Sequence, residues 1–174
     1  MYSLKIGGVM VVIIACYMLG ELFYEQLRKR LINLKELHKV GRVFKANIRY
    51  TGEDIEEIMK NIYDRVGGEI KEFIGEIITR IGIRESNDVN DLWKISVREK
   101  LESMFLSEDE LLIINRFGDT LGIMDKEMQI ENTELYLDEL QIKIDDLEKD
   151  LKQKKKLYKT LSIATGIFIV LLIV

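Results

Sequence analysis

Few side chains in this protein have the types and spacing that acid–base, nucleophilic or metal chemistry requires. There is one histidine, His38, and one cysteine, Cys16, so a nucleophile–histidine pair or a zinc site would have a single imidazole to work with. The adjacent acidic pairs Glu56-Glu57 and Asp145-Asp146 do not face each other on a helix and are typical of charged surface. No glycine-rich loop leads into Lys-Ser or Lys-Thr, as a phosphate-binding loop would. We therefore expect no enzyme, no cofactor, no metal ion and no small-molecule substrate.

Composition narrows the class of protein further. The formal net charge is −4 over 174 residues. A nucleic-acid-binding protein usually has a basic stripe that dominates its charge balance, so we do not expect this class. The single cysteine cannot form an intramolecular disulfide, and this suits a reducing compartment. Proline is absent, and apolar residues recur at spacings of three and four. This pattern predicts an all-α protein.

Two apolar ends enclose the rest of the chain. Residues 6–23 are apolar apart from Glu21, and a helix that crosses a bilayer needs about 20 such residues. Residues 157–174 end in a shorter run that is apolar on every face of a helix, which argues against a helix buried in a core, because protein would have to surround it. We predict transmembrane helices over residues 4–24 and 158–174, with residues 25–157 forming the domain between them.

Lysine and arginine indicate the orientation of these two helices. Basic residues follow the first apolar run and precede the second, so both ends place the central domain in the cytoplasm and the protein in the cell membrane. A competing interpretation takes residues 13–16, IIAC, as a lipoprotein cleavage site, which would place the domain outside the cell. The apolar run continues well past Cys16, and both basic clusters would then lie on the wrong side.

Breaks in the apolar spacing divide the chain into six helices. We predict an antiparallel bundle whose long first and last helices continue into the two transmembrane helices. The first helix covers about residues 5–50, and Thr51 can cap the second. Gly67-Gly68 is expected to end the second helix and Gly82 the third, and the fourth is expected over residues 89–105. Ser107 and Glu110 have the spacing of a capping box, which would begin the fifth.

Gly118 and Gly122 leave two interpretations of the stretch 117–129. In one uninterrupted helix the two glycines share a stripe with Asp125 and Gln129. That helix would extend from residue 108 to 174, about 100 Å at the standard rise, which suits a compact domain poorly. A turn requires only Gly122 after the end of one helix and Asp125 as the N-cap of the next. We favour the turn.

Several sequence features occur together in one known family. They are Leu112, the run Phe117-Gly118-Asp119-Thr120-Leu121-Gly122, then Asp125 and Gln129, and a lysine-rich stretch with leucines that leads into the closing apolar tail. With these residues the chain resembles the stage III sporulation protein AB family of endospore-forming Firmicutes. Trp93, Tyr50 and both apolar ends also fit, so the resemblance covers nearly the whole chain. One departure is Glu53-Asp54-Ile55, where the family commonly has Thr-Pro-Leu.

The resemblance implies a mother-cell membrane protein in the assembly that links mother cell and forespore, with its domain in the mother-cell cytoplasm. It also implies similarity to the cytoplasmic domains of the type II secretion F and type IV pilus platform proteins, whose Gly-Glu-x-x-Gly corner parallels Gly118-Asp119-x-x-Gly122. We therefore expect a platform or scaffold subunit that docks other subunits of the channel complex, such as a secretion-type ATPase. The expected docking residues are Gly118, Asp119, Gly122, Asp125 and Gln129.

Other interpretations stay open. The protein could be a structural or lipid-sensing tether without an ATPase partner, because the lysine cluster at residues 152–159 can bind anionic lipid as well as mark the cytoplasmic side. A third hypothesis is an enzyme that uses surface carboxylates. Trp93 fits either a core residue or a partner anchor, and the Gly118 corner fits a plain turn as well as a docking surface.

Overall fold

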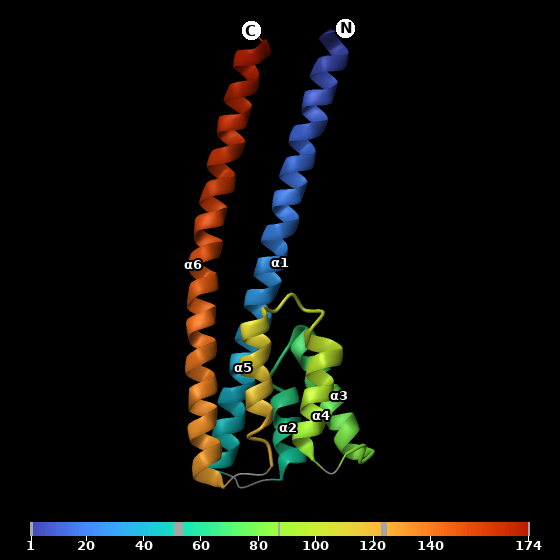
Figure 1. Ribbon diagram of the computed structural model, residues 1–174, viewed down its shortest axis with the longest axis vertical. Helices are drawn as coiled ribbons and strands as arrows, with labels where there is room; N and C mark the ends of the chain where they lie inside the picture. Colours follow the sequence, from blue (N-terminus) through green and yellow to red (C-terminus); the bar gives the residue numbers. More distant parts are fainter. Residues whose placement is uncertain (1, 51–53, 87, 123–124, 174) are drawn as a thin grey trace. The chain divides into compact units, whose positions relative to one another are not determined.

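The computed structural model describes the backbone of residues 2–50, 54–86, 88–122 and 125–173, and the side chains of residues 14, 18, 21–50, 54–86, 88–122 and 125–154. Over the described backbone the chain is helical and contains no strand, which confirms the predicted all-α class. Figure 1 shows the helices in order: α1 (Tyr2–Tyr50), α2 (Ile55–Tyr63), α3 (Gly68–Gly82), α4 (Val89–Ser96) followed directly by the π-helix η1 (Val97–Leu101), α5 (Glu108–Gly118) and α6 (Lys126–Ile173).

The chain divides into two compact units. One is Arg30–Asp145, and the other consists of Met1–Lys29 and Asp146–Val174. Among the described side chains, none of the helices has a stretch long and apolar enough to span a bilayer. The predicted transmembrane segments 4–24 and 158–174 fall mostly on side chains outside that set. Both segments, and the domain boundaries that follow from them, stay predictions.

Five aromatic rings, one each from α1, α3, α4, α5 and α6, form the centre of the Arg30–Asp145 unit. Phe117 lies in the middle, with its ring centroid 5.3 Å from Phe44, 5.3 Å from Trp93 and 4.4 Å from Tyr136. Phe73 extends the cluster at 5.0 Å from Trp93. Edge-to-face and offset ring pairs stabilise a core by about 0.5–1.5 kcal/mol each beyond the area they bury. Trp93 is fully buried, so it is a core residue.

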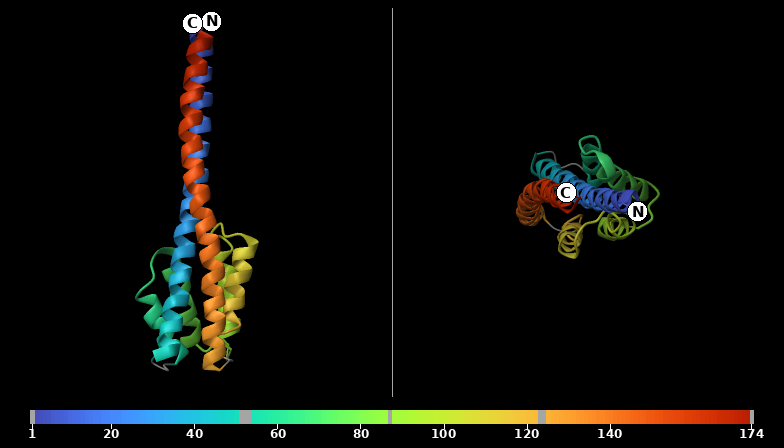
Figure 2. Two further views of the ribbon diagram at one scale, coloured as in Figure 1. Left: turned by 90° about the vertical axis from the view of Figure 1, so that its left-hand side faces the viewer. Right: turned by 90° about the horizontal axis from the view of Figure 1, so that it is seen from above.

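Within this unit α1 and α6 lie side by side and antiparallel, as Figure 1 and the left view of Figure 2 show. Gly41 allows the close approach, because a Cβ atom there would lie 2.7 Å from Cε1 of Tyr136. The Tyr136 hydroxyl donates to the carbonyl oxygen of Leu37 at 3.0 Å. Further along α1, Lys45 pairs with the earlier α6 residue Glu134 at 2.6 Å. Position 41 is thus a close-packing point between α1 and α6.

Several predicted helix starts are confirmed. Ser107 begins α5 with a complete capping box, in which its Oγ accepts from the backbone N–H of Glu110 at 3.3 Å and Glu110 Oε2 accepts from the N–H of Ser107 at 2.7 Å. Asp88 caps α4 by accepting from the N–H of Asn90 at 2.9 Å. Thr51, the proposed cap of the second helix, lies outside the described residues, and Asp54 directly precedes α2.

Three details of the helix prediction are wrong. α2 ends at Tyr63, and the two glycines instead begin α3, with Gly68 at φ +58°. Gly68 can adopt that conformation because it has no Cβ atom. The apolar spacing of α2 predicts Tyr63 on its inward face, but this side chain is 36% exposed. Phe105 lies beyond the end of the fourth helix, which closes as the π-helix η1, and its side chain is exposed.

Candidate interaction surface at the α5–α6 corner

The corner between α5 and α6 begins at Gly118, the last residue of α5. A Cβ atom at this position would lie 2.4 Å from Cδ1 of Trp93, so only glycine allows the indole ring to pack there. The ring is held in place because its Nε1–H donates to the carbonyl oxygen of Ile114 at 2.9 Å. Gly118 therefore couples the corner to the aromatic core.

The stretch after Gly118 is a turn, as favoured from the sequence. Gly122 has φ +89°, a left-handed conformation that side chains rarely adopt. Asp125 precedes α6 and its Oδ1 accepts from the N–H of Met128 at 3.0 Å, which is the expected N-cap bond. Gln129 then reaches back across the turn, where its Nε2 donates to the carbonyl oxygen of Thr120 at 3.1 Å. The interpretation as one continuous helix is excluded.

The five predicted docking residues divide into an inner and an outer set. Gly118 and Gln129 are buried, whereas Asp119, Gly122 and Asp125 face outward. Buried residues stabilise the turn, and exposed residues of such a loop are the ones that a partner can contact. The outward set is the part of the prediction that a partner could contact.

Asp119 carries the polar contacts on the outer side of the corner. Its Oδ1 lies 2.7 Å from Nζ of Lys94 and accepts from Nδ2 of Asn90 at 3.2 Å. The hydrogen bond to Asp119 raises the pKa of Lys94 above its ordinary value. Because both charged side chains are about half exposed, the pair contributes little stability.

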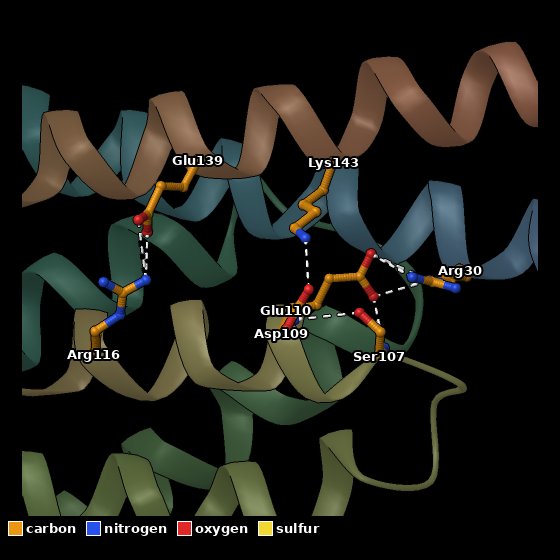
Figure 3. Close-up of polar contacts among 7 residues, drawn as sticks. All are labelled: Arg30, Ser107, Asp109, Glu110, Arg116, Glu139 and Lys143. Atoms are coloured by element: carbon orange, nitrogen blue, oxygen red, sulfur yellow. Dashed lines mark hydrogen bonds and ion pairs between the residues drawn. The ribbon is translucent and has the colours of Figure 1, made fainter.

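Charged contacts also connect α5 to both long helices, as Figure 3 shows. Glu110, fully buried, accepts from Nη2 of Arg30 at 2.8 Å and from Nε of Arg30 at 2.9 Å. The more exposed Asp109 lies 2.9 Å from Nζ of Lys143 on α6, and this lysine lowers the pKa of its carboxyl group. The bidentate geometry makes the Arg30–Glu110 pair the stronger and more specific of these contacts.

An open groove of about 220 Å³ lies between α5 and α6 and starts at the corner. Its apolar lining comes from Ile113, Phe117, Leu135 and Tyr136. Its polar lining includes Asp119, Thr120, Asn132 and the ion pair of Arg116 with Glu139, whose Nη2 and Oε2 atoms are 2.8 Å apart. The groove therefore places the exposed Leu135 and the buried rings of Phe117 and Tyr136 next to charged groups.

Sequence reasoning missed this groove. The apolar spacing of the last helix does not distinguish Tyr136 from its neighbour Leu137, although Tyr136 is the more buried of the two. The spacing also gives no reason to place Leu135 beside α5. A signal was present, since Met128, Leu135 and Ile142 recur every seventh residue, a spacing that keeps side chains on one face of a helix.

A metal or catalytic centre is not apparent in the part of the chain that the structure describes. No group of three or more His, Cys, Asp or Glu side chains there is arranged to hold a metal ion. His38 is only partly buried, and desolvation, together with the charge of Arg42, lowers its pKa. The polar and apolar groups of the corner and groove in this part of the chain include Asp119, the Arg116–Glu139 pair and the apolar lining around Leu135.

Comparison with known proteins identifies the family. The model of the family described as stage III sporulation protein AB matches residues 5–174. This chain belongs to the stage III sporulation protein AB family. Stage III sporulation protein AB of Bacillus subtilis (strain 168) is 21% identical over 170 residues, which cover 98% of this chain and 99% of that protein. The resemblance found in the sequence is confirmed.

A solved structure supports the same fold. The structure of Stage III sporulation protein AB (SpoIIIAB) matches with a TM-score of 0.62 and 20% sequence identity. The match covers 70% of this chain and 94% of the other. At this identity the similarity shows a shared fold, and family membership rests on the family model.

Proposed function

We propose that this protein is a non-enzymatic platform subunit of the sporulation channel complex between mother cell and forespore. In this proposal the apolar ends anchor it in the mother-cell membrane and residues 25–157 lie in the mother-cell cytoplasm. The match to the stage III sporulation protein AB family over residues 5–174 carries the proposal. Membership in that family implies work with other subunits of the sporulation machinery.

The proposed docking surface is the outer side of the α5–α6 corner. Asp119, Gly122 and Asp125 are exposed there, while Gly118 packs against Trp93 and Gln129 of α6 bonds to Thr120 just after α5. A surface held rigidly loses little conformational entropy when a partner binds. The partner we propose is a secretion-type ATPase or a fellow membrane subunit.

Site-specific crosslinking in sporulating cells tests this function. A photoreactive residue in place of Asp119 is expected to crosslink to the ATPase or another subunit of the channel complex, identified by mass spectrometry. The matched control is Asp64, an exposed aspartate at the end of α2, from which no such crosslink is expected. The proposal fails if the chain accumulates at normal levels and position 119 reaches no subunit of the complex.

The alternative is a structural or lipid-sensing tether that has no ATPase partner. The tether would need other residues than the platform, because the lysine cluster at residues 152–159 would bind anionic lipid. Replacing these lysines with glutamine would abolish function in the tether and would leave the crosslink at position 119 intact in the platform.

A further inference from the structure

The outer face of α6 carries a row of exposed apolar side chains. Met128, Leu135 and Ile142 are spaced seven residues apart and are 47%, 53% and 60% exposed. Successive members of such a row drift by only about 20° around the helix. Single exposed apolar residues are ordinary, but a row aligned along one helix face has the pattern of a helix–helix contact.

The row meets the groove between α5 and α6 at Leu135. This side chain lines the groove together with Ile113, Phe117 and Tyr136, so the apolar surface continues inward to the aromatic core. The volume of about 220 Å³ exceeds that of an engineered cavity of about 150 Å³ that binds benzene. One leucine or phenylalanine side chain from a partner fits this space.

The charges around the row indicate the chemistry of the partner. Residues 125–145 contain seven acidic and two basic residues, although the whole chain has a net charge of only −4. Glu131, Asp138 and Asp145 form a second row, offset by three residues from the apolar one and also exposed. Of the two basic residues, Lys143 is engaged by Asp109, and two of the acidic residues are also paired, Glu134 with Lys45 and Glu139 with Arg116.

This acidic border argues against two other occupants. A second copy of the chain, paired through the same face, would bring the two acidic rows together, and like charges across an interface disfavour pairing. An anionic membrane surface would be repelled for the same reason. A helix with lysine or arginine beside its apolar row satisfies both the apolar and the acidic parts of the surface.

We propose that the outer face of α6 and the α5–α6 groove bind a basic amphipathic helix of another subunit of the sporulation complex. One apolar side chain of that helix enters the groove between Phe117 and Leu135. Its lysine or arginine residues face the acidic row of Glu131, Asp138 and Asp145. This inference rests on the proposed platform function and adds the chemistry of the partner to it.

Peptide binding to the full-length protein in uncharged detergent micelles tests the proposal. The probe is a fluorescent helical peptide of about three heptads with leucine on one face and lysine on both sides of that face. A second peptide has the same leucines and glutamate in place of lysine. Anisotropy is expected to show binding of the lysine peptide, weakened by added salt, and no binding of the glutamate peptide.

Matched serine substitutions then locate the binding site. Leu135→Ser is expected to raise the dissociation constant at least about tenfold, as the loss of a central apolar contact does. Ile83→Ser is the control, since Ile83 is similarly exposed at the end of α3, and it is expected to change the constant by less than about twofold. Tryptophan fluorescence verifies that both variants are folded.

Three results would overturn the proposal: no binding of the lysine peptide, equal binding of the glutamate peptide, or equal loss of affinity in the two serine variants. Failure here and failure of the platform function are distinguishable. If peptide binding fails while position 119 still crosslinks to the complex, only the basic helix is ruled out. If the peptide binds but position 119 reaches no subunit, the platform function fails.

Discussion

Gly118 of α5 lies so close to Trp93 of α4 that a Cβ atom at position 118 would come within 2.4 Å of the indole Cδ1. The indole cannot move aside easily. It lies between Phe73 and Phe117 and donates to the carbonyl oxygen of Ile114. The contact between Gly118 and Trp93 therefore fixes the end of α5, next to the proposed docking surface.

Gly118→Ala is expected to destabilise the protein by about 1–3 kcal/mol, the usual cost of overpacking a core. Denaturant unfolding monitored by the fluorescence of Trp93, the single tryptophan, measures the change. Gly82→Ala is the control, because a Cβ atom at that helix end meets nothing within 4 Å. Equal stability of the two variants would show that the indole ring can shift at no cost.

The turn between α5 and α6 depends on the N-cap bond of Asp125 to Met128. Asp125→Ala should cost about 1 kcal/mol, whereas Asp125→Asn keeps an accepting oxygen and should cost much less. Thermal unfolding of the two variants compares them. Because Asp125→Asn also removes the negative charge, a loss of partner binding in this variant at unchanged stability would assign the charge to docking. Similar destabilisation by both variants would contradict the capping role.

The free energy of unfolding should depend on pH in alkali because of Tyr136. Burial raises the pKa of its phenol above the ordinary value, so the folded protein retains this proton at a pH where the unfolded chain releases it. The resulting stability is complete below about pH 10 and is lost as the pH rises further. Tyr136→Phe removes the hydrogen bond to Leu37, so its free energy of unfolding should be about 1 kcal/mol lower at neutral pH. This free energy should then fall less steeply with rising pH than in the parent.

Urea unfolding at several alkaline pH values measures this difference between the parent and Tyr136→Phe. The control is Tyr63→Phe, which removes a hydroxyl from an exposed position on α2 and should behave as the parent does. Parallel alkaline declines in the parent and in Tyr136→Phe would show that another group causes the loss.

Loss of the negative charge at Glu110 should lower the stability of the protein more than the same change at its neighbour Asp109. Glu110→Gln leaves Arg30 without its bidentate partner in a part-buried site, and we expect a loss of about 2–4 kcal/mol. Asp109→Asn breaks only the exposed pair with Lys143, with an expected loss of at most about 1 kcal/mol. Calorimetric unfolding of both variants tests the ranking. The reverse order would mean that Glu110 is held by its capping bonds alone.

The features that the sequence predicts well are local ones. Ser107 and Glu110 are three residues apart, and Asp125 caps the start of α6 three residues after the left-handed Gly122, although α5 itself already ends at Gly118. Such signals depend on backbone groups next to the residues themselves. For that reason the capping box, the turn and the family resemblance could all be found before the fold was known.

The features that the sequence misses depend on distant partners. Arg30 and Glu110 are eighty residues apart, and nothing in either neighbourhood indicates their pairing. Tyr136 and Leu137 both fit an apolar helix face and both lie over Gly41, but only Tyr136 also contacts Phe117 and bonds to Leu37. The π-helix η1 has no distinctive residue pattern, and the groove exists only where α5 and α6 meet. Tertiary contacts of this kind override local preference.

The central claim is that the outer face of α6 receives a basic helix from another subunit, and crosslinking from position 135 tests it most directly. A photoreactive residue replaces Leu135 in sporulating cells, with position 83 as the control, and mass spectrometry identifies the crosslinked peptide. The account predicts a peptide from another subunit of the complex, with lysine or arginine beside an apolar row, at position 135 only. A crosslink to a second copy of this chain, the same crosslinks from both positions, or none from position 135 would contradict it.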